Sequence, residues 1–173
     1  SATTPTQLQI SSMTLRNTVA YGGVSLDRAT NVYFNNVKFH GSYASGGSDA
    51  STSKGVTVNH SNATYSTSNV SFNQCQFMKF ARLVDISFNA TNIRFHNCDF
   101  NTAFYGALIG AEMDGSTAGL TDGPRDMQFT SSSWSTIGQQ AILVAPKTGT
   151  TDGAGPRHIV SHANFYAKTV GNS

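Results

Sequence analysis

The sequence predicts an all-β protein: a right-handed parallel β-helix of about six coils, with three short strands in each coil. The first observation is an apolar strand pattern that recurs with constant internal spacing along nearly the whole chain. Such repetition is typical of a solenoid. The second is the composition, in which Ser, Thr, Asn and Gly are abundant whereas Glu occurs once. This balance favours strands and turns over long helices.

Each coil is expected to begin with two strands that meet at a bend. An apolar residue in the first strand is followed five positions later by an aromatic or large apolar residue in the second. Between them a polar residue shifts the two-residue alternation by one position, which indicates a sharp bend. The first-strand positions are Ile10, Phe34, Phe72, Phe95, Phe129 and Val160, the bend positions Ser12, Asn36, Gln74, Asn97, Ser131 and His162, and the second-strand positions Leu15, Phe39, Phe77, Phe100, Trp134 and Phe165.

A third strand is expected after each second strand, and in the second coil a Gly- and Ser-rich insertion over residues 40–54 precedes it. Its predicted inward residues are Val24 and Leu26, Val56 and Val58, Ile86 and Phe88, Ile109 and Ala111, and Leu143 and Ala145. The coils are then 24, 38, 23, 34 and 31 residues long. A β-sandwich is the alternative, but the constant offsets argue against it. Residues 1–6 are interpreted as a linker or junction, and residues 7–173 as the β-helix domain.

The late third strands are apolar on their outward positions as well. Leu108, Ile142 and Val144 lie where earlier coils have Ser25, Thr57 and Asp85. A strand that is apolar on both faces is typically covered. Self-association or an overlying segment would provide the cover.

Cys75 and Cys98 occupy the same position of successive units, 23 residues apart. They are therefore expected to be stacked neighbours that point into the core. Free thiols packed as small apolar groups are the expected state. A disulfide is the alternative, although stacked parallel strands suit its geometry poorly. Neither these cysteines nor the five histidines have metal-ligand spacing, so no metal and no cofactor are expected.

Two long third-turn loops, over residues 112–125 and 146–157, hold most of the acidic residues outside the strands. Because they belong to consecutive coils, they should protrude next to each other. Both contain Thr-Asp-Gly, which is common in turns, but together they can also form a polar ridge for a polyhydroxylated ligand. Glycosidic cleavage typically uses two carboxyl groups. The candidate catalytic residues are Glu112, Asp114, Asp122 and Asp152, and the candidate ligand-binding residues are Arg125, Arg157 and the aromatic residues Tyr43 and Tyr105.

The charge and hydropathy patterns argue against two other classes of partner. The net charge is only +2 and the eleven Lys and Arg residues are scattered, so nucleic acid is not an expected partner. No apolar run approaches the roughly 20 residues of a membrane span, so membrane insertion is not expected.

The recurring unit Asn-apolar-x-apolar-x-[Asn/Gln]-[Cys/Val]-x-Phe, as in residues 69–77 and 92–100, resembles the right-handed parallel β-helix superfamily. Its members include pectate lyases, polygalacturonases and bacteriophage tailspikes. This sequence lacks the Asp pairs, Gly-His-Gly and Arg-x-Lys elements, and the calcium-binding Asp cluster of pectin-cleaving members. In composition it is more similar to tailspikes and related tail proteins.

The resemblance to tailspikes implies a homotrimeric virion tail protein, or a fragment of one, that acts outside the cell. It implies that the third-turn loops contact host cell-surface polysaccharide, and it favours a binding role over cleavage. The resemblance to the wider superfamily leaves two alternatives. One is a secreted polysaccharide lyase or glycoside hydrolase, and the other is a non-binding structural spacer in a fibre or adhesin.

Overall fold

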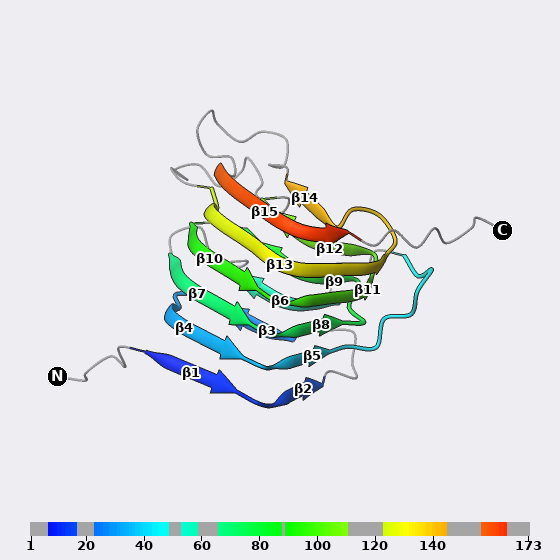
Figure 1. Ribbon diagram of the computed structural model, residues 1–173, viewed down its shortest axis with the longest axis horizontal. Coiled ribbons are helices and arrows are strands. Elements are labelled where there is room, and N and C mark those ends of the chain that lie inside the picture. The colour runs from blue at the N-terminus through cyan, green and yellow to red at the C-terminus, as the bar shows by residue number, and fades with distance from the viewer. Residues whose placement is uncertain are drawn as a thin grey trace.

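The computed structural model describes residues 7–16, 23–48, 53–58, 66–87, 89–110, 123–144 and 157–165. These residues form strands β1 to β15 and no helix, and none of them belongs to a helix that could cross a membrane. All strand pairs are parallel, and the chain winds into stacked coils (Figure 1). The predicted all-β parallel β-helix is confirmed.

The ten-stranded sheet carries the first two strands of every coil, in the order β1-β4-β7-β10-β13-β11-β8-β5-β2, with β15 paired to β13. In the fifth coil the first and second strands are continuous, as β13 (Arg125–Ile137). The first strands are β1 (Leu8–Ser11), β4 (Thr30–Asn35), β7 (Thr67–Asn73) and β10 (Ala90–His96), the second strands are β2 (Thr14–Arg16), β5 (Lys38–His40), β8 (Gln76–Met78) and β11 (Asp99–Ala103), and β15 spans Arg157–Phe165.

The five-stranded sheet carries the third strand of each of the first five coils and forms the opposite wall of the solenoid (Figure 1). Its members are β3 (Val24–Leu26), β6 (Lys54–Val58), β9 (Arg82–Ile86), β12 (Tyr105–Ile109) and β14 (Ile142–Val144).

The bends between first and second strands have left-handed backbone conformations. The φ angles of the predicted bend residues Ser12, Asn36, Gln74, Asn97 and Ser131 lie between 51° and 54°. A left-handed residue reverses the local twist, which explains why the alternation slips by one position there. Asn tolerates this conformation better than most other residues with a side chain, and it occupies two of these bends.

The prediction for the sixth coil is wrong upstream of its second strand. Phe165 pairs with Trp134 as expected, but Val160 lies opposite Gln128 instead of Phe129. His162 lies opposite Thr130, so it does not take the bend position. The physical reason is a missing residue: the register jumps from Thr130 to Ser132, and β15 has no counterpart of the bend residue Ser131.

Two stacks of aromatic rings fill the core between the sheets. Phe34, Phe72, Phe95 and Phe129 stack with centroids 4.7–4.8 Å apart and ring planes within 4° of parallel. The second stack is Phe39, Phe77, Phe100 and Trp134, with spacings of 4.8, 4.9 and 4.0 Å. Edge-to-face contacts join the two stacks, with centroids 5.5–6.2 Å apart. Each aromatic pair contributes about 0.5–1.5 kcal/mol beyond the burial of its surface.

The predicted inward residues of the first four coils that are described are inward, but the alignment of the third and fourth coils and the face of the fifth differ from the prediction. The register aligns Val24, Val56, Val84, Ala107 and Ile142 in one inward column, and Leu26, Val58, Ile86, Ile109 and Val144 in the next. Phe88, Ala111 and Ala145 lie outside the described residues. The prediction assumed a fixed spacing from the second strand, whereas the turn between the second and third strands varies in length.

The fifth coil shows the consequence for the outward face. Its turn after Trp134 is one residue longer than the turn after Phe100, and a shift of one residue exchanges the two faces of a strand. Ile142 and Val144 therefore take inward positions, not the predicted outward ones, and Leu143 lies opposite Leu108 in the outward column. Leu108 is outward as predicted, opposite Asp85, and is buried.

Cys75 and Cys98 are buried free thiols, as expected. Each thiol donates to the carbonyl two residues upstream, of Asn73 and His96 respectively, at 3.4 Å. Ser132, the next residue in the column, makes the same contact with Thr130 at 3.1 Å. A hydrogen bond with Cys75 and burial raise the pKa of the Cys98 thiol well above its ordinary value.

Truncation of a central ring should destabilise the fold strongly. Phe95 contacts Phe72 and Phe129 within its stack and is fully buried. Phe95→Ala should lower the free energy of unfolding by about 3–5 kcal/mol, and Phe95→Leu by less. Urea denaturation followed by circular dichroism measures the effect. Met13→Ala, at a side chain that is 43% exposed, is the control and should change stability by no more than about 0.5 kcal/mol.

The thiols should react only after unfolding. Both are buried and the pKa of Cys98 is raised, so a thiolate is not available to a reagent in the native protein. Titration with Ellman's reagent should detect no thiol in native protein and both thiols in guanidinium chloride without reductant. Cys98→Ser should remain folded because Ser132 already makes the same hydrogen bond. No reactive thiol after denaturation would instead indicate a disulfide.

Candidate functional site

The four candidate catalytic acids, Glu112, Asp114, Asp122 and Asp152, lie outside the described residues. Their role therefore stays a prediction. Within the described part of the chain, no group of three or more His, Cys, Asp or Glu residues could hold a metal ion.

The predicted ligand-binding residues are divided between two turns of the coil. Arg125 begins β13 and its Cα partner is Arg157 at the start of β15, so the two third-turn loops lead into neighbouring strands. Tyr43 and Tyr105 follow β5 and β11, at the turn between second and third strands. The structure thus brings the two arginine positions together and places the two tyrosines at a different turn.

The two tyrosines have different surroundings. The Tyr43 hydroxyl donates to the carbonyl of Gly47 at 2.6 Å, which ties this side chain into its own loop. Tyr105 is half-buried at the start of β12, where it lies opposite Arg82 in the register. Its ring meets Phe104 edge to face, with centroids 4.8 Å apart.

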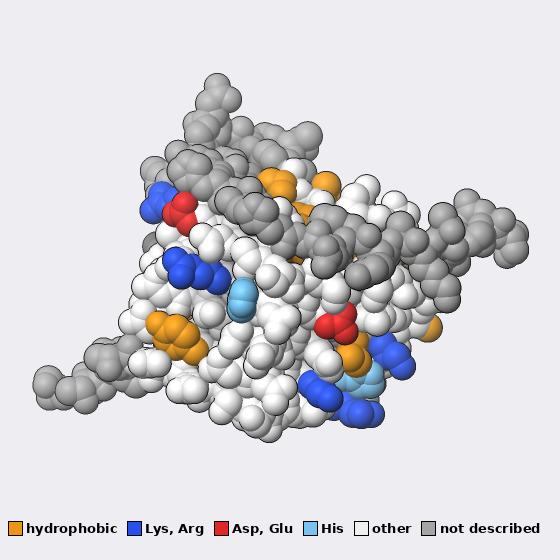
Figure 2. Space-filling model, in the orientation of Figure 1, with side chains coloured by type: hydrophobic (Ala, Val, Ile, Leu, Met, Phe, Trp, Pro, Cys, Tyr) orange, Lys and Arg blue, Asp and Glu red, His pale blue; other side chains and the backbone are white. Residues whose placement is uncertain are grey.

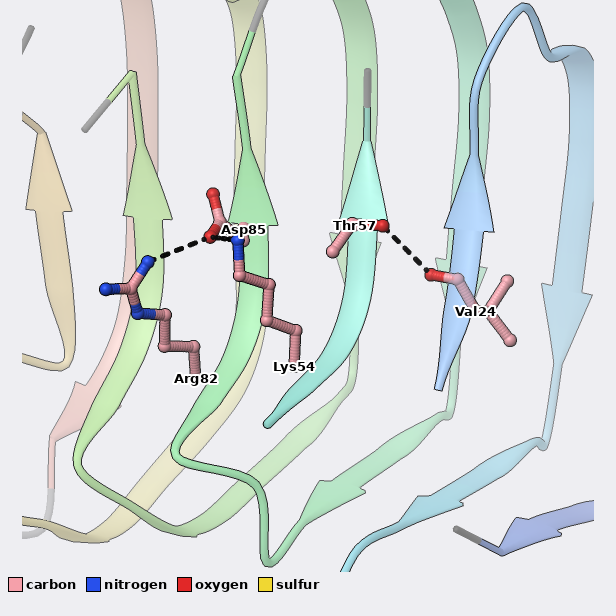
Figure 3. A network of polar contacts seen from close by, with 5 residues as sticks. All are labelled: Val24, Lys54, Thr57, Arg82 and Asp85. Carbon is pink, nitrogen blue, oxygen red and sulfur yellow. Dashed lines mark hydrogen bonds and ion pairs between the residues drawn. The ribbon is translucent and has the colours of Figure 1, made fainter. Parts of the chain in front are cut away.

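A cluster of charged side chains, which sequence reasoning missed, is buried on the five-stranded sheet beside Tyr105 (Figure 3). Lys54 Nζ lies 2.8 Å from Asp85 Oδ2, and Arg82 Nη1 lies 3.3 Å from the same oxygen. Lys54 and Arg82 are opposite each other in the register. If the third strands of the second and third coils had been aligned correctly in the sequence, Lys54 and Arg82 would have been recognised as neighbours.

This charged cluster ties the second coil to the third. Removing three charges from water is costly, and their mutual attraction offsets that cost only while all three remain in place. Asp85 Oδ1 and the Ser87 hydroxyl, both buried, have no hydrogen-bond partner within the described structure. Figure 3 also shows Thr57, which donates to the carbonyl of Val24 at 3.5 Å across the first two coils.

A ladder of asparagine amides runs along the outer surface of the ten-stranded sheet. Asn92 Nδ2 donates to Asn69 Oδ1 at 2.7 Å, and Asn69 Nδ2 donates to Asn31 Oδ1 at 3.2 Å. Arg94 Nε donates to Asn92 Oδ1 at 2.8 Å. The three asparagines have φ angles of 56–57°, a conformation that Asn accepts more readily than most residues. The Asn at the start of the second, third and fourth units was visible in the sequence, but its ladder was not predicted.

Two further outward columns lie beside this amide ladder. One contains Tyr33, Ser71, Arg94 and Gln128, and the other Asn35, Asn73, His96 and Thr130. His96 Nδ1 lies 3.0 Å from the Thr130 hydroxyl. Figure 2 shows this face, where charged side chains are few and are separated by uncharged polar surface. The amide ladder and these two columns are called the polar face below.

Loss of the central carboxylate should destabilise the charged cluster. Asp85→Asn leaves Lys54 and Arg82 buried without a full counter-charge, and breaking a buried ion pair typically costs about 3–5 kcal/mol. Urea denaturation of the variant measures the loss. Asp27→Asn, the same exchange at an exposed residue, is the control. A variant as stable as the parent chain would show that the cluster does not hold the coils together.

No family model, curated protein or solved structure matches this chain. The parallel β-helix architecture and the geometry of its faces are therefore the observations on which a functional proposal rests.

Proposed function

We propose that this chain is a tailspike-like virion protein, or the receptor-binding part of one, that binds a host cell-surface polysaccharide. The observation that carries the proposal is the polar face, which presents amide, hydroxyl and guanidinium groups in ordered columns. Its hydrogen-bonding groups recur from coil to coil. A polysaccharide also repeats the same hydroxyl groups along its length, so its chain can run along the coils.

The amide ladder is suited to hydroxyl ligands because an amide both donates and accepts. Each Asn side chain carries two N–H donors and an oxygen with two lone pairs. The contacts of Asn69 and Asn92 with their neighbours use only part of this capacity. Coils stacked about 4.8 Å apart repeat the remaining groups at short intervals.

Arg94 and Tyr33 supply more selective contacts at the same face. Arg94 uses Nε to bind Asn92 and is exposed, so its terminal nitrogens can donate to a ligand. Tyr33 lies two coils away in the same column, with the small Ser71 between them. An aromatic ring with a hydroxyl offers an apolar surface to a sugar ring together with a polar group at its edge.

A homotrimer is part of this proposal. The outward column of the five-stranded sheet becomes apolar at Leu108, which is buried, and Leu143, which is half-buried. Association through this sheet would leave the polar face of the other sheet open to a glycan. Multi-angle light scattering under native conditions tests the arrangement, and a monomer at micromolar concentration would remove the trimer from the proposal.

Glycan binding should depend on the polar face. Binding to immobilised bacterial capsules and O-antigens should retain the parent chain on at least one polysaccharide. Arg94→Gln and Tyr33→Ser should each weaken retention by about tenfold, because each removes one well-placed contact. Arg28→Gln, an exposed charge in the turn after β3, is the control and should bind normally.

Two results would contradict this assignment. Retention on no polysaccharide would contradict a receptor-binding role, and equal retention of all variants would contradict the polar face as the site. Release of new reducing ends or unsaturated products from the bound glycan would instead favour the lyase or hydrolase alternative, with catalytic acids sought among Glu112, Asp114, Asp122 and Asp152.

A further inference from the structure

Four basic side chains gather where the second strands of the first three coils end. Arg16 on β2 lies opposite His40 on β5, and Lys38 is two residues before His40 on the same strand. Lys79 directly follows β8. Figure 2 shows Lys, Arg and His side chains concentrated at the corner of the molecule where Figure 1 places β2 and β5. These four residues are called the basic cluster below.

A close backbone contact brings Lys79 to this position. The N–H groups of Gly41 and Tyr43 donate to the carbonyls of Met78 and Lys79, at 2.9 and 2.8 Å. A Cβ on Gly41 would clash with the Lys79 carbonyl and would lie 2.7 Å from a ring atom of Phe80. Glycine at this position therefore allows the turn after β5 to pack against residues 78–80. The side chain of Lys79 is thereby held close to His40.

The basic cluster forms no ion pair among the described residues, although Figure 2 shows an acidic side chain near the same corner. Arg16, Lys38 and Lys79 make no ion pair there, in contrast to Lys54 and Arg82, which share Asp85. The nearest acid by register is Asp99, two coils from Lys38 on the same column. One oxygen of Asp99 accepts a hydrogen bond from Ser133 at 2.9 Å.

The pKa of His40 responds to burial and to these positive charges. Burial of the ring and then the charges of Arg16 and Lys79 lower the pKa of His40 below its ordinary value. Its Nδ1 is buried without a hydrogen-bond partner within the described structure. In the charged imidazolium form both ring nitrogens must donate, so a buried Nδ1 without an acceptor favours the neutral ring.

We propose that the basic cluster of Arg16, Lys38, His40 and Lys79 is a binding site for an anionic group, and that the polysaccharide recognised by this chain is therefore acidic. The first part stands on the geometry of the cluster, and the second part rests on the proposed function. The guanidinium of Arg16 can bind a carboxylate, phosphate or sulfate through two N–H donors. The lysines add charge without fixed geometry, so the cluster selects an anionic group and not one particular acid.

A bound anion must raise the pKa of His40, because a negative charge close to the ring favours the imidazolium form. The charges of Arg16 on β2 and Lys79 after β8 act on His40, Lys38 lies two residues before it on the same strand, and Asp99 lies further away on β11. The anion acts on the ring through its negative charge. A change in the titration of His40 on addition of an anion therefore reports the anion itself.

The direct test is titration of the histidine side chains of the full chain by NMR, with inorganic sulfate as the probe and chloride at matched ionic strength as the reference. His40 is assigned by comparison with His40→Gln. Sulfate should raise the pKa of His40. Arg16→Gln and Lys79→Gln should each increase the sulfate concentration needed for half of the shift several-fold. Arg28→Gln should not. An unchanged pKa of His40 in sulfate would overturn the site.

The second test separates the anion site from the glycan proposal. Affinity electrophoresis in gels that contain alginate or dextran compares an acidic polysaccharide with a neutral one. Alginate should retard the chain and dextran should not, and Arg16→Gln combined with Lys79→Gln should abolish the retardation. Retardation that survives the double substitution would overturn the assignment of an acidic glycan. A sulfate effect on His40 without retention on any polysaccharide would leave the anion site standing and remove the proposed function.

Discussion

Two stacks of aromatic rings determine where everything else in this solenoid lies. Each of the second to fifth coils contributes one ring to each stack, and centroid spacings of 4.7–4.9 Å in most pairs match the distance between hydrogen-bonded strands. The rings can therefore stack face to face without stretching the ladder of backbone hydrogen bonds. A slip of one residue in a first or second strand would remove a ring from the core and expose it to water.

This constraint also orders the polar side chains. Because Phe34, Phe72, Phe95 and Phe129 are held in register, the outward residues beside them fall into columns as well. The amide ladder follows from this, since each Asn lies three residues before a core Phe. The left-handed bends follow too: Asn97, for example, allows the chain to turn between Phe95 and Phe100 while both rings point inward. The order of the outer face is thus a consequence of packing inside.

The same constraint explains what could be predicted from the sequence. The first and second strands carry the rings, so their register and bends were readable from Phe34 to Trp134. The third strands carry no stacked ring, and their turns vary in length, so Leu143 was placed on the wrong face. That error also hid the alignment of Lys54 with Arg82. The amide ladder depends on side-chain contacts between coils, which no pattern within one coil reveals.

The two groups of cations illustrate how burial decides between stability and binding. Lys54 and Arg82 are buried, and both contact Asp85. Without that carboxylate, nothing would offset the free energy needed to remove the two cations from water. Arg16, Lys38 and Lys79 are exposed, so water compensates for the missing counter-charge and the fold does not need one. Among the described residues they make no ion pair, and such a group of solvated cations contributes little to stability. Its repulsion is relieved when an anion arrives, which makes it suited to binding and not to holding coils together.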